Sequence, residues 1–187
     1  MVGRQIDNIY PEKNCDIGEE IFRVENLRRL GYFSNVSFGV RRGEILGFTG
    51  LVGAGRTEVM QSIFGADPLN GGEIYMDGER LKVKKPLDAM RAGIGLLPED
   101  RQKQSRVMEW EIYRNITLAN LAPYTHGTII NAKQEREKAS EIGNRIAVKA
   151  PTVYETVNKL SGGNQQKVVI CKLLNSDLKV LILDEPT

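Results

Sequence analysis

The chain has 187 residues, of which 41% are hydrophobic and 27% are charged, and this composition is ordinary for a soluble globular protein. Its 26 basic and 24 acidic side chains leave a formal charge of +2, which gives no general case for nucleic acid, since a nucleic-acid-binding surface concentrates basic residues on one face. No apolar run approaches the roughly 20 residues that cross a bilayer, and the N-terminal stretch MVGRQIDNIYPEKN lacks the apolar middle of a secretory signal.

The N-terminal third of the chain begins with a polar segment. Residues 1–20 contain Pro11 and Gly18 and show no periodicity, so we predict a linker there. Apolar residues then alternate along IFRVENL and FSNVSFGV, which predicts two strands over residues 21–27 and 33–40.

The next segment predicts a strand, a glycine-rich loop and a helix. The short apolar run EILGFTG at 44–50 predicts a buried strand that leads directly into the loop. After the loop, apolar residues recur at helical spacing and a glycine stop signal follows, at Val59, Met60, Ile63, Phe64 and Gly65. Strand, glycine loop and helix form the context that a phosphate-binding loop requires.

The remaining elements alternate between short strands and helices. NGGEIYMDGERL predicts a hairpin-like pair of strands, and MRAGIGLLPED predicts a buried strand that ends at Pro98. From about Trp110 to Ala150 the pattern is helical, and the charged residues of its clearest amphipathic piece are interpreted as a solvated face: Lys133, Glu135, Glu137 and Lys138. KVLILDEPT predicts a last buried strand that ends at two carboxylates.

Residues 50–57, GLVGAGRT, nearly reproduce a phosphate-binding loop, which needs Gly, four residues, Gly, Lys, and then Ser or Thr. Its glycines let backbone N–H groups approach a phosphate chain closely, and the following helix adds its positive N-terminal end. The candidate nucleotide-binding residues are Gly50, Leu51, Val52, Gly53, Ala54, Gly55, Arg56, Thr57 and Glu58. The Thr57 hydroxyl also suits a magnesium ion. For this string taken alone, a glycine-rich turn without a ligand is the alternative.

Arg56 occupies the position where the loop template has lysine. Arginine keeps the charge but is planar and broader, so the two side chains are not interchangeable at a tight site. We expect nucleotide binding to be retained, because backbone amides provide much of the binding to the phosphates. We expect hydrolysis to suffer more, because it needs charge placed accurately as the terminal phosphoryl group leaves.

The string LILDEP at 181–186 places Asp184 and Glu185 at the C-terminal end of a predicted strand, where ligands collect in open α/β sheets. We expect Asp184 to hold magnesium through water and Glu185 to polarise the attacking water as the catalytic general base. Solvated strand termini are the alternative interpretation of these carboxylates.

The most specific string is LSGGNQQK at 160–167. It opens a predicted helix with bare amides and a hydroxyl, which makes a second anion site. Because one chain has one nucleotide pocket, a second phosphate-binding edge indicates a nucleotide shared between two domains. The alternative is a simple helix cap. The candidate residues of this signature motif are Leu160, Ser161, Gly162, Gly163, Asn164 and Gln165.

In order and spacing, these motifs resemble those of the nucleotide-binding domain of ABC transporters, over residues 21–187. GLVGAGRTE, LLPEDR and LSGGNQQKV together look like the second ATPase domain of the tandem ATP-binding proteins of monosaccharide importers of the ribose, galactose or xylose type. The resemblance implies an α/β P-loop NTPase fold with an N-terminal antiparallel β subdomain, a RecA-like parallel-sheet core and a helical subdomain at about 105–165. It also implies that the C-terminal part of the core is absent.

The resemblance implies ATP and Mg²⁺ as cofactors and a companion ABC ATPase domain in a head-to-tail dimer. It further implies membrane permease subunits as partners, a sugar-binding protein as an indirect partner, no nucleic acid, and a peripheral location on the cytoplasmic face of the cell membrane. In such domains a glutamine after the hairpin contacts magnesium, and here Glu99 occupies that position; Tyr32 is the candidate for stacking on adenine. We expect the pocket built on Arg56 to be slow or nucleotide-holding, while LSGGNQQ completes the companion's competent pocket.

In this fold, a strand ending in a switch histidine lies between the phosphate-loop strand and the strand at 180–185. We therefore expect a gap in the central sheet and no ATP hydrolysis by these 187 residues alone, with the lone His126 at the surface. Cys15 and Cys171 lie far apart without a CxxC pattern, which indicates a reducing cytosol. Two alternatives remain: a nucleotide-binding regulatory module, and a non-transport ABC-type ATPase acting on nucleic acid or ribosomes.

Overall fold

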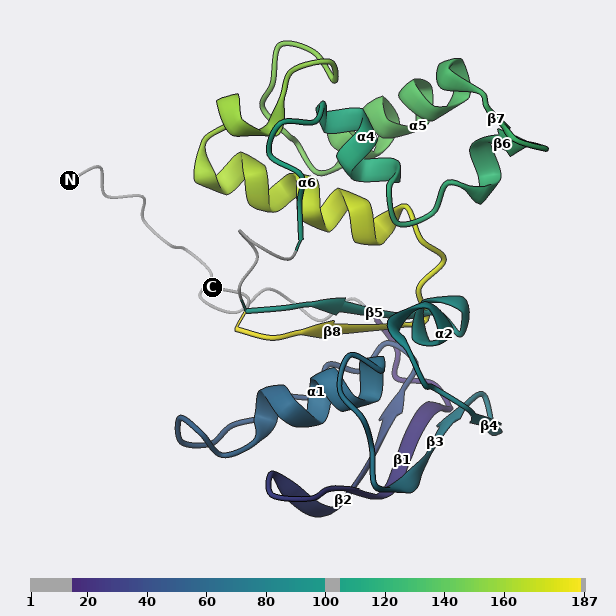
Figure 1. Ribbon diagram of the computed structural model, residues 1–187, viewed down its shortest axis with the longest axis vertical. Helices are drawn as coiled ribbons and strands as arrows, with labels where there is room; N and C mark the ends of the chain where they lie inside the picture. The colour runs from purple at the N-terminus through teal and green to yellow at the C-terminus, as the bar shows by residue number, and fades with distance from the viewer. Residues whose placement is uncertain (1–14, 100–104, 186–187) are drawn as a thin grey trace.

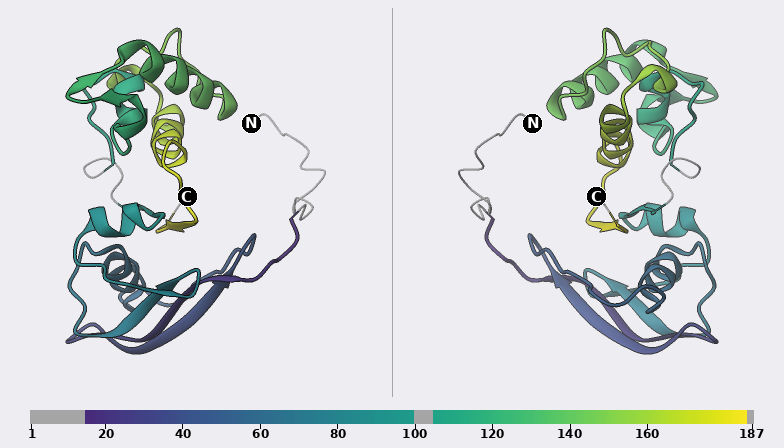
Figure 2. Two further views of the ribbon diagram at one scale, coloured as in Figure 1. Left: turned by 90° about the vertical axis from the view of Figure 1, so that its right-hand side faces the viewer. Right: turned by 90° about the vertical axis from the view of Figure 1, so that its left-hand side faces the viewer.

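The computed structural model of the protein describes residues 15–99 and 105–185. Figure 1 shows a layered molecule: an antiparallel sheet and helix α1 form the base, a short pair of parallel strands lies in the middle, and a helical half lies above. The side views in Figure 2 show the same order of layers. Of the predicted linker, residues 1–14 lie outside the described part of the chain.

The antiparallel sheet has the strand order β2-β1-β3-β4. Its strands are β1 (Glu20–Arg29), β2 (Phe33–Arg41), β3 (Gly71–Met76) and β4 (Glu79–Leu81), which confirms the first two predicted strands and the predicted hairpin. The alternation of β1 buries Phe22 and Val24 and then shifts to Leu27. The shift occurs at Asn26, whose φ of 51° makes a bulge and whose N–H donates to Ser37 Oγ.

Helix α1 (Arg56–Phe64) packs its apolar face on this sheet. Val59, Met60 and Ile63 are buried in the same cluster as the β1 side chains, so the predicted helical spacing is confirmed. Gly65 ends the helix with a φ of 76°, the left-handed conformation that favours glycine at this position. The short helix α2 (Pro86–Arg91) then leads to the middle layer.

The middle layer is a parallel pair formed by β5 (Ile94–Leu97) and β8 (Val180–Leu183), with Leu97 opposite Leu183. β5 is mostly buried and stops before Pro98, as predicted. The prediction of a buried last strand is only partly right, because Ile182 is buried while Leu181 and Leu183 are 42% and 48% exposed. Within the described residues β8 pairs with β5 alone, so its other edge has no neighbouring strand.

The predicted strand at residues 44–50 is wrong. The segment is irregular, and Ile45 is 86% exposed. A strand persists through ladder hydrogen bonds to a neighbour, and in the described part of the chain no strand pairs with this segment. A cavity of about 650 Å³ lies between residues 43–48 and β8, lined on its inner side by Phe22, Phe38 and Ile63. The cavity lies where the gap in the central sheet was expected, but the phosphate-loop strand that was to form one side of that gap is not a strand here.

The helical half contains α4 (Ile112–Thr117), α5 (Ala132–Arg145) and α6 (Gly162–Leu174), with 3-10 turns η1 (Ala122–Tyr124) and η2 (Val157–Lys159). Strands β6 (Thr125–His126) and β7 (Ile129–Ile130) make a small hairpin that the helical pattern did not predict; His126 is exposed there, as expected. The three helices enclose a second core: Ile112, Tyr113, Ile116, Ala139, Ile142, Val157, Val168 and Cys171.

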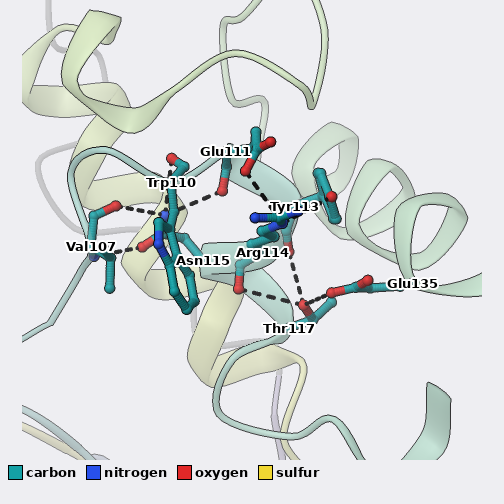
Figure 3. Close-up of polar contacts among 8 residues, drawn as sticks. All are labelled: Val107, Trp110, Glu111, Tyr113, Arg114, Asn115, Thr117 and Glu135. Atoms are coloured by element: carbon teal, nitrogen blue, oxygen red, sulfur yellow. Dashed lines mark hydrogen bonds and ion pairs between the residues drawn. The ribbon is translucent and has the colours of Figure 1, made fainter. Parts of the chain in front are cut away.

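A polar network fixes α4 within this half, as Figure 3 shows. The Asn115 side chain accepts from Val107 N at 2.8 Å and donates to Val107 O at 2.9 Å, which holds the preceding segment against the helix. Glu135 was predicted on a solvated face, but it is only 6% exposed and accepts a hydrogen bond from Thr117 Oγ1 at 2.6 Å. Its partner lies on another element, so the local charge pattern of α5 carried no sign of this burial.

Helix α6 joins the helical half to the middle layer. Val168 and Cys171 face the helical core, while Val169 and Leu173 pack with Leu97 and Leu178 beside β5. Because one face of α6 contacts the helical core and the other contacts β5, this helix positions the helical half relative to the parallel strands (Figure 1). Within residues 15–99 and 105–185, no helix has the length and apolar character that crossing a membrane requires.

Candidate nucleotide site and signature motif

The glycine loop at 50–57 forms a tight curl that runs into α1. Ala54 N donates to Leu51 O at 3.1 Å, and Val59 N donates to Gly55 O at 3.0 Å as the first helical bond. Gly53 and Gly55 have φ values of 79° and 85°, which a side chain disfavours. Leu51 and Val52 at the tip are 85% and 97% exposed. The loop therefore presents backbone and the start of a nine-residue helix to solvent, the arrangement that binds phosphate.

Arg56 lies over the base of this loop. A Cβ added at Gly50 would be 3.7 Å from Arg56 Cδ, so the arginine stem covers the glycine. Its Nη2 then reaches to 3.7 Å from Glu185 Oε1, and both residues line the cavity beside β8. The structure thus brings together the residue at the lysine position and the predicted general base.

Asp184 and Glu185 follow β8 directly. Asp184 N donates to Leu97 O at 2.9 Å, which extends the parallel pairing by one residue. Because the pairing is parallel, Glu99 after β5 and the two carboxylates after β8 emerge at the same edge of the sheet. Glu99 is exposed there, while Asp100 and Arg101 of the LLPEDR string lie outside the described residues.

The Asp184 carboxylate fits a role in holding a cation. Asp184 is 8% exposed, and its Oδ2 is buried without a hydrogen-bond partner among the described residues. An unpaired buried carboxylate oxygen is costly, and a bound magnesium ion or its water would satisfy it. Thr57, in the first turn of α1, supplies the hydroxyl that the phosphate-loop template assigns to the same ion.

Tyr32 lies beside the glycine loop. Its backbone O is 3.4 Å from the position that a Cβ on Gly55 would take, and its side chain is 57% exposed. The Arg29 guanidinium carbon is 4.0 Å from the centre of the Tyr32 ring, and Arg29 is itself paired with Asp67. Sequence reasoning missed Arg29, because its partner Asp67 is distant in the chain and carries no local signal.

The signature motif lies at the N-terminal end of α6, where Ser161 is the N-cap residue. Ser161, Gly162 and Gly163 are exposed, whereas Leu160 packs against the helical core. Gln165 Nε2 donates to Leu160 O at 2.9 Å and to Val157 O at 3.3 Å, so it braces the turn before the helix. The six motif residues therefore divide into an exposed edge and an internal support.

The glycines of the motif have no role in packing. A Cβ added at Gly162 or Gly163 would meet nothing within 4 Å, and neither residue has a positive φ. Both glycines lie in the first turn of α6, and glycine is a poorer helix former than alanine. No contact within the described residues explains why glycine occupies these two positions. A partner that approaches this edge closely would explain it. α1 and α6 lie on opposite sides of the β5–β8 pair (Figure 1), so the loop and the motif, each at the N-terminus of its helix, belong to different layers of the domain.

The family profile described as ABC transporter matches residues 33–187. This chain belongs to the ABC transporter family. Its place in that family as an ATPase domain follows from the relatives below and from the loop, the carboxylates and the signature motif described above.

Curated relatives match this ABC transporter ATPase domain along its whole length. The ribose import ATP-binding proteins RbsA of Oceanobacillus iheyensis and Lactococcus lactis subsp. cremoris are 45% and 48% identical to it over 187 residues, 100% of this chain and 38% of each relative. A putative ribose/galactose/methyl galactoside import ATP-binding protein of Rhizobium etli is 46% identical, over 100% of this chain and 36% of its own. The chain thus spans about two fifths of the length of these relatives.

Solved structures confirm the P-loop ABC ATPase fold. A nucleotide-free ATP-binding cassette from an ABC transporter superposes with a TM-score of 0.74 at 23% identity, over 90% of this domain and 70% of that chain. A dimeric cassette in a post-hydrolysis state, bound to ADP and Pi, gives a TM-score of 0.70 at 19% identity, over 89% and 75%. At these identities the likeness concerns the fold alone.

Proposed function

We propose that this ABC transporter ATPase domain binds ATP with Mg²⁺ and works head to tail with a companion ATPase domain in the import of a monosaccharide. It would be the second ATPase domain of a tandem protein, attached to the cytoplasmic face of the membrane through permease subunits, with a sugar-binding protein upstream. Its own pocket holds nucleotide and turns over slowly, while its LSGGNQQ motif completes the companion's pocket. The names of the relatives, which specify ribose or galactose import, support the substrate class.

The observation that carries the slow pocket is the pairing of Arg56 with Glu185 at 3.7 Å. A general base must lie within hydrogen-bond reach of the water it activates. Here the Glu185 carboxylate lies beside the guanidinium of Arg56, whose stem stays over the base of the loop. Both side chains are partly exposed, at 32% and 56%, so the pair is weak, and a bound polyphosphate would compete for Arg56.

The remaining residues bind and orient the nucleotide. The backbone amides of residues 50–57 and the N-terminus of α1 would hold the phosphates, and Tyr32 offers an exposed ring beside the loop for the base. Thr57 and Asp184 would hold magnesium, which when bound neutralises charge on the terminal phosphates. Glu99, at the edge shared with Asp184, would bring a carboxylate where the family has a neutral amide, and this extra negative charge opposes accurate placement of the phosphates.

The observation that carries motif donation is the exposed Ser161-Gly162-Gly163 edge, with glycines that the chain's own packing does not need. Because the loop and the motif belong to different layers of the domain, on opposite sides of the β5–β8 pair, we infer that the motif binds a nucleotide held by another domain.

The test uses the complete ATPase, with both domains present. Arg56→Lys together with Glu99→Gln is expected to raise single-site turnover in this pocket, measured with the companion's general base disabled. No gain in turnover would count against the slow-pocket assignment. Glu137→Gln, a substitution at an exposed position on α5, is the matched control for effects of mutation and purification that are unrelated to the pocket.

Arg56 also favours a second candidate, a nucleotide-binding regulatory module without a transport role, because such a module needs binding but not hydrolysis. Co-purification of the complete protein with a membrane permease would argue against this candidate. Nucleotide-dependent binding to a soluble partner instead would support it.

A further inference from the structure

The side-chain amide of Asn164 links Ser161 to the loop that precedes the signature turn. Asn164 Oδ1 accepts a hydrogen bond from Lys149 N at 2.9 Å, and Asn164 Nδ2 donates to Ser161 Oγ at 3.1 Å. A backbone N–H only donates, so the amide oxygen must face Lys149 and the amide NH₂ must face Ser161. The hydrogen-bond network therefore determines which way the amide points.

That orientation determines what the Ser161 hydroxyl can do. A hydroxyl group has one proton to donate and lone pairs that accept. Asn164 uses a lone pair, so the proton is left for another acceptor. Ser161 is the N-cap residue of α6, yet its side chain accepts no capping bond from the helix backbone, and it is exposed. The hydroxyl proton and the first N–H groups of α6 are thus presented together at the same edge.

We propose that Asn164 is a positioning residue that holds the Ser161 hydroxyl ready to donate to a terminal phosphate oxygen of the nucleotide in the companion domain. The inference rests on the proposed function, in which this motif completes that pocket. Asn164 itself is half-buried and tied to Lys149, so it acts through Ser161 and does not touch the phosphate. The empty space around Gly162 and Gly163 leaves room for the phosphate at the same edge.

Asn164→Asp tests this role with little change in size. The new carboxylate still accepts from Lys149 N, but toward Ser161 it presents an acceptor in place of a donor. The Ser161 hydroxyl then donates to this carboxylate rather than to the phosphate, and the companion's nucleotide loses one charge-assisted hydrogen bond. We expect the companion's kcat to fall about tenfold or more, with a smaller change in KM, because the bond matters most as charge develops on the terminal phosphate.

The experiment is a double-mutant cycle in the complete two-domain ATPase, with Ser161→Ala, Asn164→Asp and both together. If Asn164 acts through Ser161, the double variant is no worse than Ser161→Ala by more than about twofold. A second readout is the affinity of the two domains for each other in the presence of a non-hydrolysable ATP analogue. This affinity should also be no lower in the double variant than in Ser161→Ala by more than about twofold. The uncharged Asn164→Ala goes through the same cycle, in case the aspartate variant folds poorly by circular dichroism.

Asn131→Asp is the matched control. Asn131 is the N-cap of α5 in the same helical half, where its Oδ1 accepts from Lys133 N and Gln134 N. An aspartate retains those bonds and adds the same charge, so turnover should stay within about twofold of the parent.

The outcomes separate the two claims. Normal turnover and association in Ser161→Ala would overturn the proposed donation of the motif to a companion. Impairment by Ser161→Ala with no effect of either Asn164 variant, or with effects that multiply in the double variants, would overturn the positioning role and leave the proposed function standing.

Discussion

Arg56 Nη2 lies 3.7 Å from Glu185 Oε1, so the residue at the lysine position of the phosphate loop is paired with the carboxylate that follows the last strand. The two residues come from α1 and from the end of β8, and both line the cavity. In the proposed nucleotide site, a bound polyphosphate would compete with Glu185 for the Arg56 guanidinium.

The first prediction concerns this pair. Arg56→Lys alone should raise single-site turnover several-fold, because the shorter, compact ammonium fits between the phosphates and releases Glu185. Glu185→Gln added to Arg56→Lys should remove that gain, since the amide is no base. If turnover is the same whether or not Glu185 is replaced, Glu185 is not the base of this pocket.

A second prediction concerns the orphaned oxygen of Asp184. Asp184→Asn removes a buried charge whose Oδ2 has no hydrogen-bond partner among the described residues, so the apo domain should be as stable as the parent or more so. The same variant should lose most of the extra thermal stabilisation that Mg²⁺ adds to ATP, measured as a shift in Tm. An undiminished magnesium effect would place the ion elsewhere.

A third prediction tests the buried Glu135. Thr117→Val removes the hydroxyl that donates to Glu135 Oε1, which leaves a buried carboxylate oxygen short of a donor. The free energy of unfolding should fall by about 1–3 kcal/mol in urea titrations. Glu137→Gln, on the exposed face of the same helix, should change it by less than about 0.5 kcal/mol. Equal effects of the two variants would contradict the burial of Glu135.

A fourth prediction compares two glycines with similar backbone angles. Gly65 and Gly78 have φ values of 76° and 80°, but a Cβ on Gly65 would lie 2.7 Å from Val83 Cγ1 and 2.9 Å from Lys85 C, while a Cβ on Gly78 meets nothing within 4 Å. Gly78→Ala should cost about 1 kcal/mol from conformation alone. Gly65→Ala should cost about 1–3 kcal/mol more, because the end of α1 must shift. Thermal unfolding of the pair measures the difference directly.

A fifth prediction concerns the two thiols. Cys171 is buried between the helices, and burial raises its pKa from 9.0 to about 11, whereas Cys15 is exposed. A thiol reagent at pH 8 should therefore label Cys15 in the native protein and reach Cys171 only after unfolding.

The raised pKa of Cys171 also makes the free energy of unfolding depend on pH. The folded pKa of Cys171 is raised above the unfolded value, so the stability it contributes is present below pH 9 and is lost as the pH rises from 9 toward 11. Cys171→Ala should flatten this decline relative to the parent, although its lower packing volume reduces stability at every pH. An unchanged slope would contradict the shift.

Sequence patterns predicted the elements whose signals are local. The helical spacing after the glycine loop, the hairpin of NGGEIYMDGERL and the helix opened by Ser161 all depend on residues a few positions apart, and the structure has each of them. The apolar run at 44–50 shows the limit of such signals, because periodicity reports that a segment can form a strand but not that a neighbouring strand exists to pair with it.

The features of the candidate site also divide into those with a local sequence signal and those without one. Residues 50–57 and the carboxylates after β8 were evident from their strings, since each string carries its own chemistry. The pairing of Arg56 with Glu185, and the ties from Asn164 to Lys149 and Ser161, were not, because each depends on how distant elements come together. Burial of Glu135 by a threonine on α4 belongs to the same class.

In the part of the chain that the structure describes, one edge of β8 has no neighbouring strand, and this affects how the polypeptide behaves in isolation. Its backbone groups and the partly exposed Leu181 and Leu183 form a short template that another chain can extend by strand addition. Purified alone and concentrated, the domain would self-associate through this edge, and a capping strand supplied in trans would keep it monodisperse.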